Sequence, residues 1–158
     1  MGESMASRVT RLISGSINAL IDKAEDISPQ IVRQEGIREV ETMIDKVKIA
    51  LGKESVKKLQ LQEATQNLTK EYETLTSQIG IALEKEREDL AKSAIAKQIE
   101  LESQALSKKE ALSTLNDNIT KLEGYIDALG KKKLQLKKEL VPLPSNTTKF
   151  YSTKGLAR

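Results

Sequence analysis

Between Pro29 and Pro142, hydrophobic residues recur at alternating intervals of three and four along two stretches of the chain. The first series consists of Ile37, Val40, Ile44, Val47, Leu51, Glu54, Lys58, Leu61, Thr65, Leu68, Tyr72, Leu75, Ile79 and Ala82. The second consists of Ala91, Ala94, Gln98, Leu101, Ala105, Lys108, Leu112, Leu115, Ile119, Leu122, Ile126, Leu129, Lys133, Leu136 and Leu140. This spacing keeps each series on one helix face and is typical of a coiled-coil seam. The polar members Glu54, Lys58 and Lys108 either fix the register, mark a bendable stretch, or are imperfections that a long seam tolerates.

The repeat is broken between the two seams. The step from Ala82 to Ala91 is nine residues, whereas an unbroken repeat has steps of three or four, or of seven or a multiple of seven. The break is either a stutter in one continuous helix or the point at which the chain reverses. Reversal is favoured because the two segments have matched lengths, about 50 residues or 75 Å each, and because Gly80 lowers helix propensity beside the break. We therefore expect an all-α fold in which residues 27–141 form a long antiparallel coiled-coil hairpin with its tip near residues 82–90.

The segment before the hairpin has a shorter amphipathic pattern. At 100° per residue, its hydrophobic side chains occupy one half of the helix circumference, and serine, arginine and glycine occupy most of the other half. The hydrophobic half consists of Met5, Val9, Leu12, Ile13, Ile17, Leu20 and Ile21. Such a face can insert into a membrane surface or pack on the hairpin as a core element, and the sequence leaves both roles open. Ser28 followed by Pro29 is typical of a helix start, so residues 1–26 are expected to form a separate amphipathic helix.

Composition disfavours most enzymatic chemistry. The 158 residues include no cysteine and no histidine, so the thiol nucleophile, the commonest general base and the usual transition-metal ligands are missing. We expect no catalytic residue, no metal site and no cofactor, and hence a protein that is not an enzyme. With 26 basic and 23 acidic side chains, the net charge is too small to indicate a nucleic-acid partner. No stretch approaches the ~20 apolar residues that span a bilayer, and no secretory signal is visible, so a cytoplasmic location is expected.

The charged clusters and the tail have ordinary explanations. The acidic run at residues 84–89 could hold a hard cation, but Lys85 and Arg87 alternate with its carboxylates, which favours a solvated helix tip. The lysines between residues 131 and 138 could contact phosphates, but no aromatic residue lies among them to stack on bases, which favours a solvated helix face. Residues 142–158 are rich in proline, serine, threonine and lysine and are expected to form a flexible tail.

Two segments resemble the phage-shock protein A family, which includes the vesicle-inducing protein of plastids and cyanobacteria and belongs to the ESCRT-III superfamily. Residues 17–26, INALIDKAED, followed by Pro29, are similar to that family's junction between its amphipathic helix and its first long helix. Within residues 82–91, ALEKEREDLA, Ala82-Leu83, Lys85 and residues 87–91 are similar to its hairpin tip and lie at the expected distance downstream. The alignable region covers about residues 8–140.

The resemblance implies a non-enzymatic peripheral protein on the inner face of the plasma membrane that self-assembles and remodels or protects this membrane under stress. Its partners would be anionic or curved membrane and further copies of the chain. Membrane binding would fall to Met5, Arg8, Val9, Arg11, Leu12, Ile13, Ile17 and Leu20. Contacts between neighbouring hairpins would fall to Glu84, Lys85, Arg87, Glu88, Asp89 and Leu90.

The sequence departs from the family pattern at two places. Typical members continue with several further helices, whereas here Pro142 and Pro144 end the second helix, so that polymerisation could depend on a longer paralogue. Some relatives inhibit a AAA+ transcriptional activator through the hairpin, and Tyr72 stands here where they often carry tryptophan near the tip. The alternative function is a soluble coiled-coil regulator that binds such a protein partner and covers the hairpin with its first helix.

Overall fold

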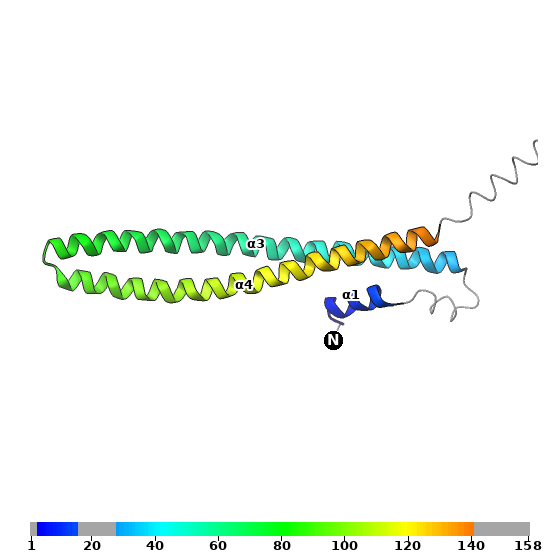
Figure 1. Ribbon diagram of the computed structural model, residues 1–158, viewed down its shortest axis with the longest axis horizontal. Coiled ribbons are helices and arrows are strands. Elements are labelled where there is room, and N and C mark those ends of the chain that lie inside the picture. Colours follow the sequence, from blue (N-terminus) through cyan, green and yellow to red (C-terminus); the bar gives the residue numbers. More distant parts are fainter. Residues whose placement is uncertain (1–2, 16–27, 141–158) are drawn as a thin grey trace, which may run out of the picture. The chain divides into compact units, whose positions relative to one another are not determined.

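The computed structural model describes residues 3–15 and 28–140, and all regular structure within these ranges is helical. Helix α1 spans Met5–Ser14, α3 spans Pro29–Glu84 and α4 spans Glu88–Glu139 (Figure 1). The last two are antiparallel and form the long helical hairpin that the break in the repeat predicts, which confirms the reversal. The expected tail and the positions of Ile17 and Leu20 lie outside the described residues.

Both predicted seams form the contact between α3 and α4. Every seam residue of the two helices is buried or half-buried, whereas many hydrophobic residues outside the seams, such as Ile49 and Leu59, are exposed. The polar seam residues follow the same pattern. Glu54 is half-buried, and its carboxylate meets the Lys57 ammonium at 3.1 Å, so its charge is paired at the edge of the seam.

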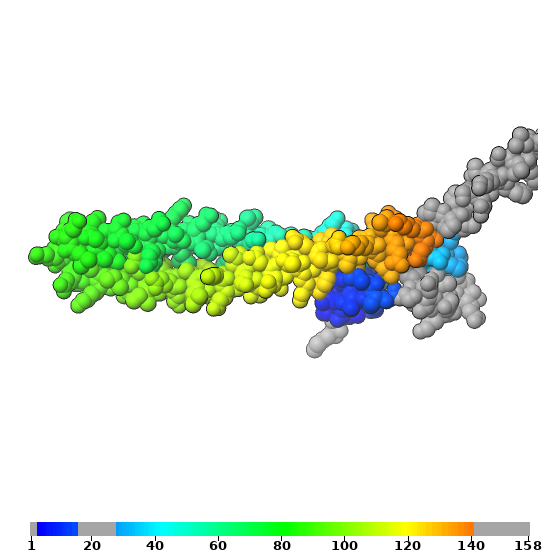
Figure 2. All heavy atoms as spheres, viewed as in Figure 1, coloured from blue at the N-terminus to red at the C-terminus, as the bar shows by residue number. Residues whose placement is uncertain are grey.

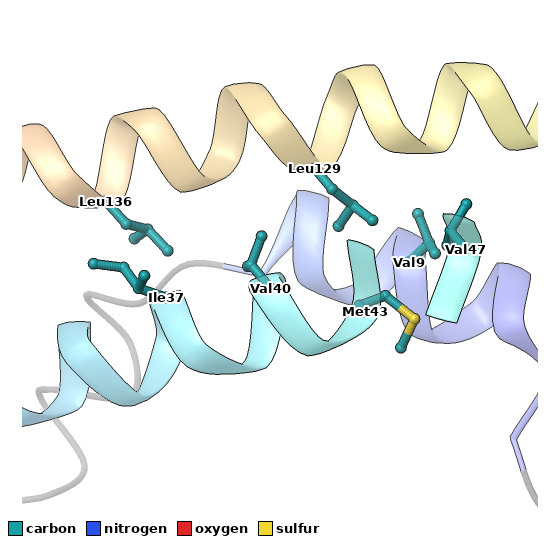
Figure 3. Packing of buried hydrophobic residues seen from close by; sticks show 7 residues of the cluster. All are labelled: Val9, Ile37, Val40, Met43, Val47, Leu129 and Leu136. Atoms are coloured by element: carbon teal, nitrogen blue, oxygen red, sulfur yellow. The ribbon is translucent and has the colours of Figure 1, made fainter. Parts of the chain in front are cut away.

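The chain divides into two compact units, and each contains a part of both long helices. The first consists of residues 1–50 and 122–158, and its described part includes α1. Its buried hydrophobic side chains form one group, called here the α1 cluster: Val9, Ile37, Val40, Met43, Val47, Leu129 and Leu136 (Figure 3). Side chains from three helices meet in this cluster, so α1 is part of the core of the first unit.

The second unit, Leu51–Lys121, contains the turn of the hairpin and has a sparser core. Its buried hydrophobic residues are Leu75, Ala82, Ala91 and Leu101. Buried Gln98 on α4 donates through Nε2 to the backbone oxygen of Tyr72 at 3.1 Å and to Thr76 Oγ1 at 2.8 Å. The Tyr72 hydroxyl donates to Glu102 Oε1 at 3.0 Å, and this bond to a carboxylate raises the pKa of Tyr72. These polar contacts favour the observed register between the two helices, because a slip would separate the buried Gln98 amide from both of these partners.

Within this unit, α3 also carries a run of hydroxyl groups that bond to its own backbone. Each hydroxyl donates to the carbonyl oxygen four residues earlier, from Ser55, Thr65, Thr69, Thr74, Thr76 and Ser77. On α4 the structure shows one such bond, at Thr114. Hydroxyl bonds of this kind slightly destabilise helices and often bend them, so α3 is the more easily bent of the two helices.

Candidate functional site

Helix α1 is short and has a defined end on each side. The Ser4 hydroxyl accepts a hydrogen bond from the Ser7 N–H at 3.2 Å, which is the usual cap at a helix start. At the other end the Gly15 N–H donates to the Arg11 carbonyl oxygen at 2.7 Å. A Cβ at Gly15 would lie 2.6 Å from that same oxygen, so only glycine fits without a shift of the backbone. The Gly15 carbonyl accepts a bond from Lys132 Nζ at 3.1 Å, which ties the end of α1 to α4.

The hydrophobic face of α1 packs on the hairpin. Val9 is 0% exposed and belongs to the α1 cluster, and Met5 and Leu12 pack against this cluster from α1. Figure 2 shows α1 in contact with the last turns of α4. Ile13, which the sequence places on the same face, is 37% exposed and lies at the edge of the contact. Of the two roles that the sequence leaves open for this face, the structure therefore shows packing on the hairpin.

Arg11 of α1 lies on the outer part of this contact. The Arg11 guanidinium meets the Glu3 carboxylate at 2.7 Å and lies 4.0 Å from the Glu39 carboxylate of α3. More than half of the Arg11 side chain is exposed, so solvent screens both pairs and each contributes little to stability. Arg8 is half-buried. The polar face of α1 is thus joined to the hairpin only weakly.

Three residues that complete the contact with α1 lie outside both predicted seams. Met43 is 6% exposed within the α1 cluster, Tyr125 packs against the cluster, and Lys132 reaches the end of α1. Each precedes a seam residue by one position, so together they extend the packing surface of the seams to one side, where α1 packs. The two hydrophobic side chains beside the seams are the sequence signal that could have revealed this contact.

The turn between α3 and α4 takes residues 85–87 and is closed by backbone hydrogen bonds. The Glu86 N–H donates to the Leu83 oxygen at 3.1 Å, and the Arg87 N–H donates to the Ala82 oxygen at 2.8 Å. These two bonds pair the last carbonyls of α3 in a Schellman motif. Glu86 has a φ of 56°, the left-handed conformation that this motif requires and that glycine usually supplies. This explains how the chain reverses in a stretch that contains no typical turn residue.

The first turn of α4 carries acidic side chains. The Arg87 guanidinium donates to Asp89 through Nε and Nη2, both at 3.2 Å. This pair, helped by the Leu90 N–H, lowers the pKa of Asp89. Since the pKa is lower in the folded protein, the stabilising contribution of Asp89 is complete at neutral pH and is lost as the pH falls through that lowered value. All the residues predicted for contacts at the tip, Glu84, Lys85, Arg87, Glu88, Asp89 and Leu90, are exposed.

A groove of about 610 Å³ lies beside the turn, between α3 and α4. Its lining combines aliphatic side chains with polar and basic ones: Leu75, Gln78, Ile81, Ala82, Lys85, Arg87, Leu90, Ser93, Ala94 and Lys97. Three of the lining side chains are cationic and none is acidic. The groove therefore presents a positive and partly apolar surface beside the turn.

The model that describes the PspA/IM30 family matches residues 4–148, a span that begins at the cap of α1 and includes both long helices. The chain belongs to the PspA/IM30 family. This agrees with the resemblance carried by the segments at residues 17–26 and 82–91. The PspA/IM30 family consists of non-enzymatic scaffolds that self-assemble and associate with membranes in the manner of ESCRT-III proteins, so membership supports a function of this general kind.

The described residues add two findings to the PspA/IM30 assignment. None of the helices within them is long and apolar enough to cross a membrane. In the same ranges, no group of three or more acidic side chains is placed to hold a metal ion.

The left-handed residue at the turn of this PspA/IM30 hairpin leads to a prediction. We expect Glu86→Gly to raise the free energy of unfolding by about 0.5–1 kcal/mol, because glycine adopts a positive φ without the steric cost that a Cβ imposes. Urea denaturation followed by circular dichroism measures the change. Glu84→Gly is the matched control, since it lies in the last turn of α3 and should be destabilising by up to about 1 kcal/mol. Equal destabilisation by both variants would contradict the strain at Glu86.

Proposed function

We propose that this protein is a peripheral scaffold that binds anionic or curved regions of the cytoplasmic membrane at its inner face and protects or remodels the membrane under stress. The observation that carries the proposal is an amphipathic helix placed ahead of a PspA/IM30 hairpin. Its hydrophobic face presents Met5, Val9, Leu12 and Ile13, and Arg8 and Arg11 provide the positive charge for anionic headgroups. The predicted face continues to Ile17 and Leu20 along the chain.

The expected membrane affinity of one copy is modest. Each aliphatic side chain that enters the bilayer contributes about 1.5–3 kcal/mol, and each arginine near an anionic surface adds about 1 kcal/mol. Ordering the backbone of a helix offsets much of this, at about 1–2 kcal/mol per residue. Binding by one copy is therefore reversible, and stable attachment requires many helices acting together, which self-assembly provides.

Self-assembly is supported by hydrophobic side chains exposed on the long helices. In the second unit these include Val56, Leu59, Ile81, Leu83, Leu90, Ile95, Ile99 and Leu106. These side chains are spread along both helices of the unit, so a neighbouring copy that packs alongside would find apolar positions over its whole length. The residues at 84–90 and the groove beside them are the part that we assign to contacts with a neighbouring hairpin, contributed by another copy or by a longer paralogue.

Flotation with vesicles of phosphatidylglycerol and phosphatidylcholine tests the membrane role. We expect Ile13→Glu to lower the vesicle-bound fraction at least about tenfold, because the apolar contribution of one isoleucine is lost and a negative charge faces anionic lipid. Ile13 is chosen because it is 37% exposed, so the substitution disturbs the packing of α1 less than a change at Val9 would.

The control is Ser7→Glu, which adds the same charge to an exposed position of α1 outside the hydrophobic half. It should float nearly as well as the unmodified protein. Failure of the unmodified protein to float, or equal flotation of both variants, would refute membrane binding through this face. Negative-stain microscopy of the same samples shows whether rods, rings or coats form on the vesicles.

A second candidate function, a soluble regulator that binds a protein partner, is favoured by the burial of Val9 on the hairpin. In this role α1 would be a permanent part of the core. The flotation experiment separates the two functions, because a regulator of this kind stays with the soluble fraction at every lipid concentration.

A further inference from the structure

The surface of α1 that the proposed function assigns to lipid is the surface that packs against the hairpin. Val9 is completely buried, and Met5 and Leu12 contact the α1 cluster. Figure 3 shows Val9 beside Val47, within the group of side chains contributed by α3 and α4. These α1 side chains cannot contact the hairpin and the bilayer at the same time. We propose that the docking of α1 is an autoinhibitory contact, so that α1 must leave the hairpin before it inserts into a membrane; this inference rests on the proposed function.

Two polar contacts between α1 and the hairpin add to the hydrophobic one. Lys132 on α4 donates to the last carbonyl of the α1 cap, that of Gly15, at 3.1 Å. A cation at this end also complements the partial negative charge of a helix C-terminus. On α3, Glu39 lies 4.0 Å from the Arg11 guanidinium. The hairpin thus recognises the end of α1 and one of its arginines as well as its hydrophobic face.

The properties of α1 suit a helix that exchanges between two surfaces. It has ten residues, and isolated helices shorter than about 12–15 residues are marginal in water. It therefore requires an apolar surface, which either the hairpin or a bilayer supplies. Its attachment to the hairpin depends on one fully buried side chain, two half-buried ones, the part-buried bond from Lys132 and one exposed ion pair. Such an attachment is specific enough to hold α1 in the absence of lipid and weak enough to be replaced by a surface that binds it more tightly.

A reversible cross-link between α1 and α3 tests the autoinhibition. The chain contains no cysteine, so Arg11→Cys combined with Glu39→Cys gives one reactive pair, at positions whose native side chains approach to 4.0 Å. A short bismaleimide with a reducible disulfide in its spacer joins the two thiols, and a reductant later separates them. Flotation with vesicles of phosphatidylglycerol and phosphatidylcholine is measured before cross-linking, after cross-linking and after reduction.

We expect the cross-linked protein to lose vesicle binding by at least about tenfold relative to the same protein before cross-linking, and reduction to restore it. The comparison is made within one variant, so the missing Arg11 affects every arm equally. Equal flotation with and without the cross-link would overturn the autoinhibition and leave membrane binding intact. If the protein does not float even before cross-linking while the unmodified chain also fails to float, the proposed function and this inference both fall.

A pair of single substitutions tests the same contact without a reagent. Lys132→Gln removes the bond to the Gly15 carbonyl, whereas Lys131→Gln removes an equal charge from the next position, where the side chain is exposed and pairs with Asp127 at 3.1 Å. Both lose the same attraction to anionic lipid. We expect Lys132→Gln to bind vesicles about two- to fivefold more strongly than Lys131→Gln, because only the former loosens α1. Identical binding by the two variants would count against a restraint on α1 at this point.

Discussion

Leu129→Ala is expected to lower the free energy of unfolding by about 2–5 kcal/mol, the range for a large hydrophobic residue removed from a packed core. Leu129 is 0% exposed and belongs to the α1 cluster, to which three helices contribute. A hairpin has few fully buried side chains, so few neighbouring groups can move into the cavity that the missing leucine side chain leaves. Urea denaturation followed by circular dichroism at low protein concentration measures the loss.

Leu134→Ala provides the matched control for this experiment. It makes the same chemical change five residues later on α4, at a side chain that is 55% exposed. The expected loss there is below about 1 kcal/mol. If the two alanine variants unfold at the same urea concentration, Leu129 does not have the role that its burial indicates.

Val9→Asp is expected to release α1 from the hairpin. A carboxylate at this position would be buried among aliphatic side chains with no partner, at a cost of several kcal/mol. A ten-residue helix attached mainly through this side chain cannot offset that cost, and once released it is too short to stay folded in water. Hydrogen exchange without lipid measures the result as a loss of protection of at least about tenfold in the second half of α1.

The exchange of α3 in the second unit should change little in this variant, because the hairpin seam there contains no residue of α1. Thr10→Asp serves as the control, since it places the same charge on the neighbouring, exposed position of α1. Protection of α1 that survives Val9→Asp would show that other contacts hold the helix. Protection that is equally lost in both variants would show that charge alone disrupts α1.

The hairpin could be predicted from the sequence because the repeat of hydrophobic positions directly reflects how two helices pack. The seam from Ile37 to Ala82 and the seam from Ala91 to Leu140 are buried or half-buried at every position, and the turn falls where the repeat breaks. Even the polar seam residues Glu54 and Lys58 are half-buried, since their long side chains can cover the seam with their methylene groups while the charged ends reach water.

The backbone conformation of the turn and the docking of α1 are harder to predict than the position of the turn, for two physical reasons. Glu86 takes a positive φ because the turn between two packed helices requires it there, and glutamate gives no local signal for that conformation. The amphipathic pattern of α1 shows only that the helix requires an apolar surface. Whether Val9 contacts lipid or packs against α3 and α4 depends on side chains far along the chain, such as Met43 and Tyr125.

The hydroxyl groups of α3 have a mechanical consequence for the second unit. Between Ser55 and Ser77, hydroxyl groups on α3 donate to backbone carbonyls of the same helix, whereas α4 has one such bond, at Thr114. The two helices of this unit therefore differ in stiffness. A pair of helices of unequal stiffness bends more readily in one direction than in the other. If copies of the chain coat a membrane as proposed, this difference lets the coat follow vesicles of different radius by a small, shared flexure, with its lateral contacts kept in place.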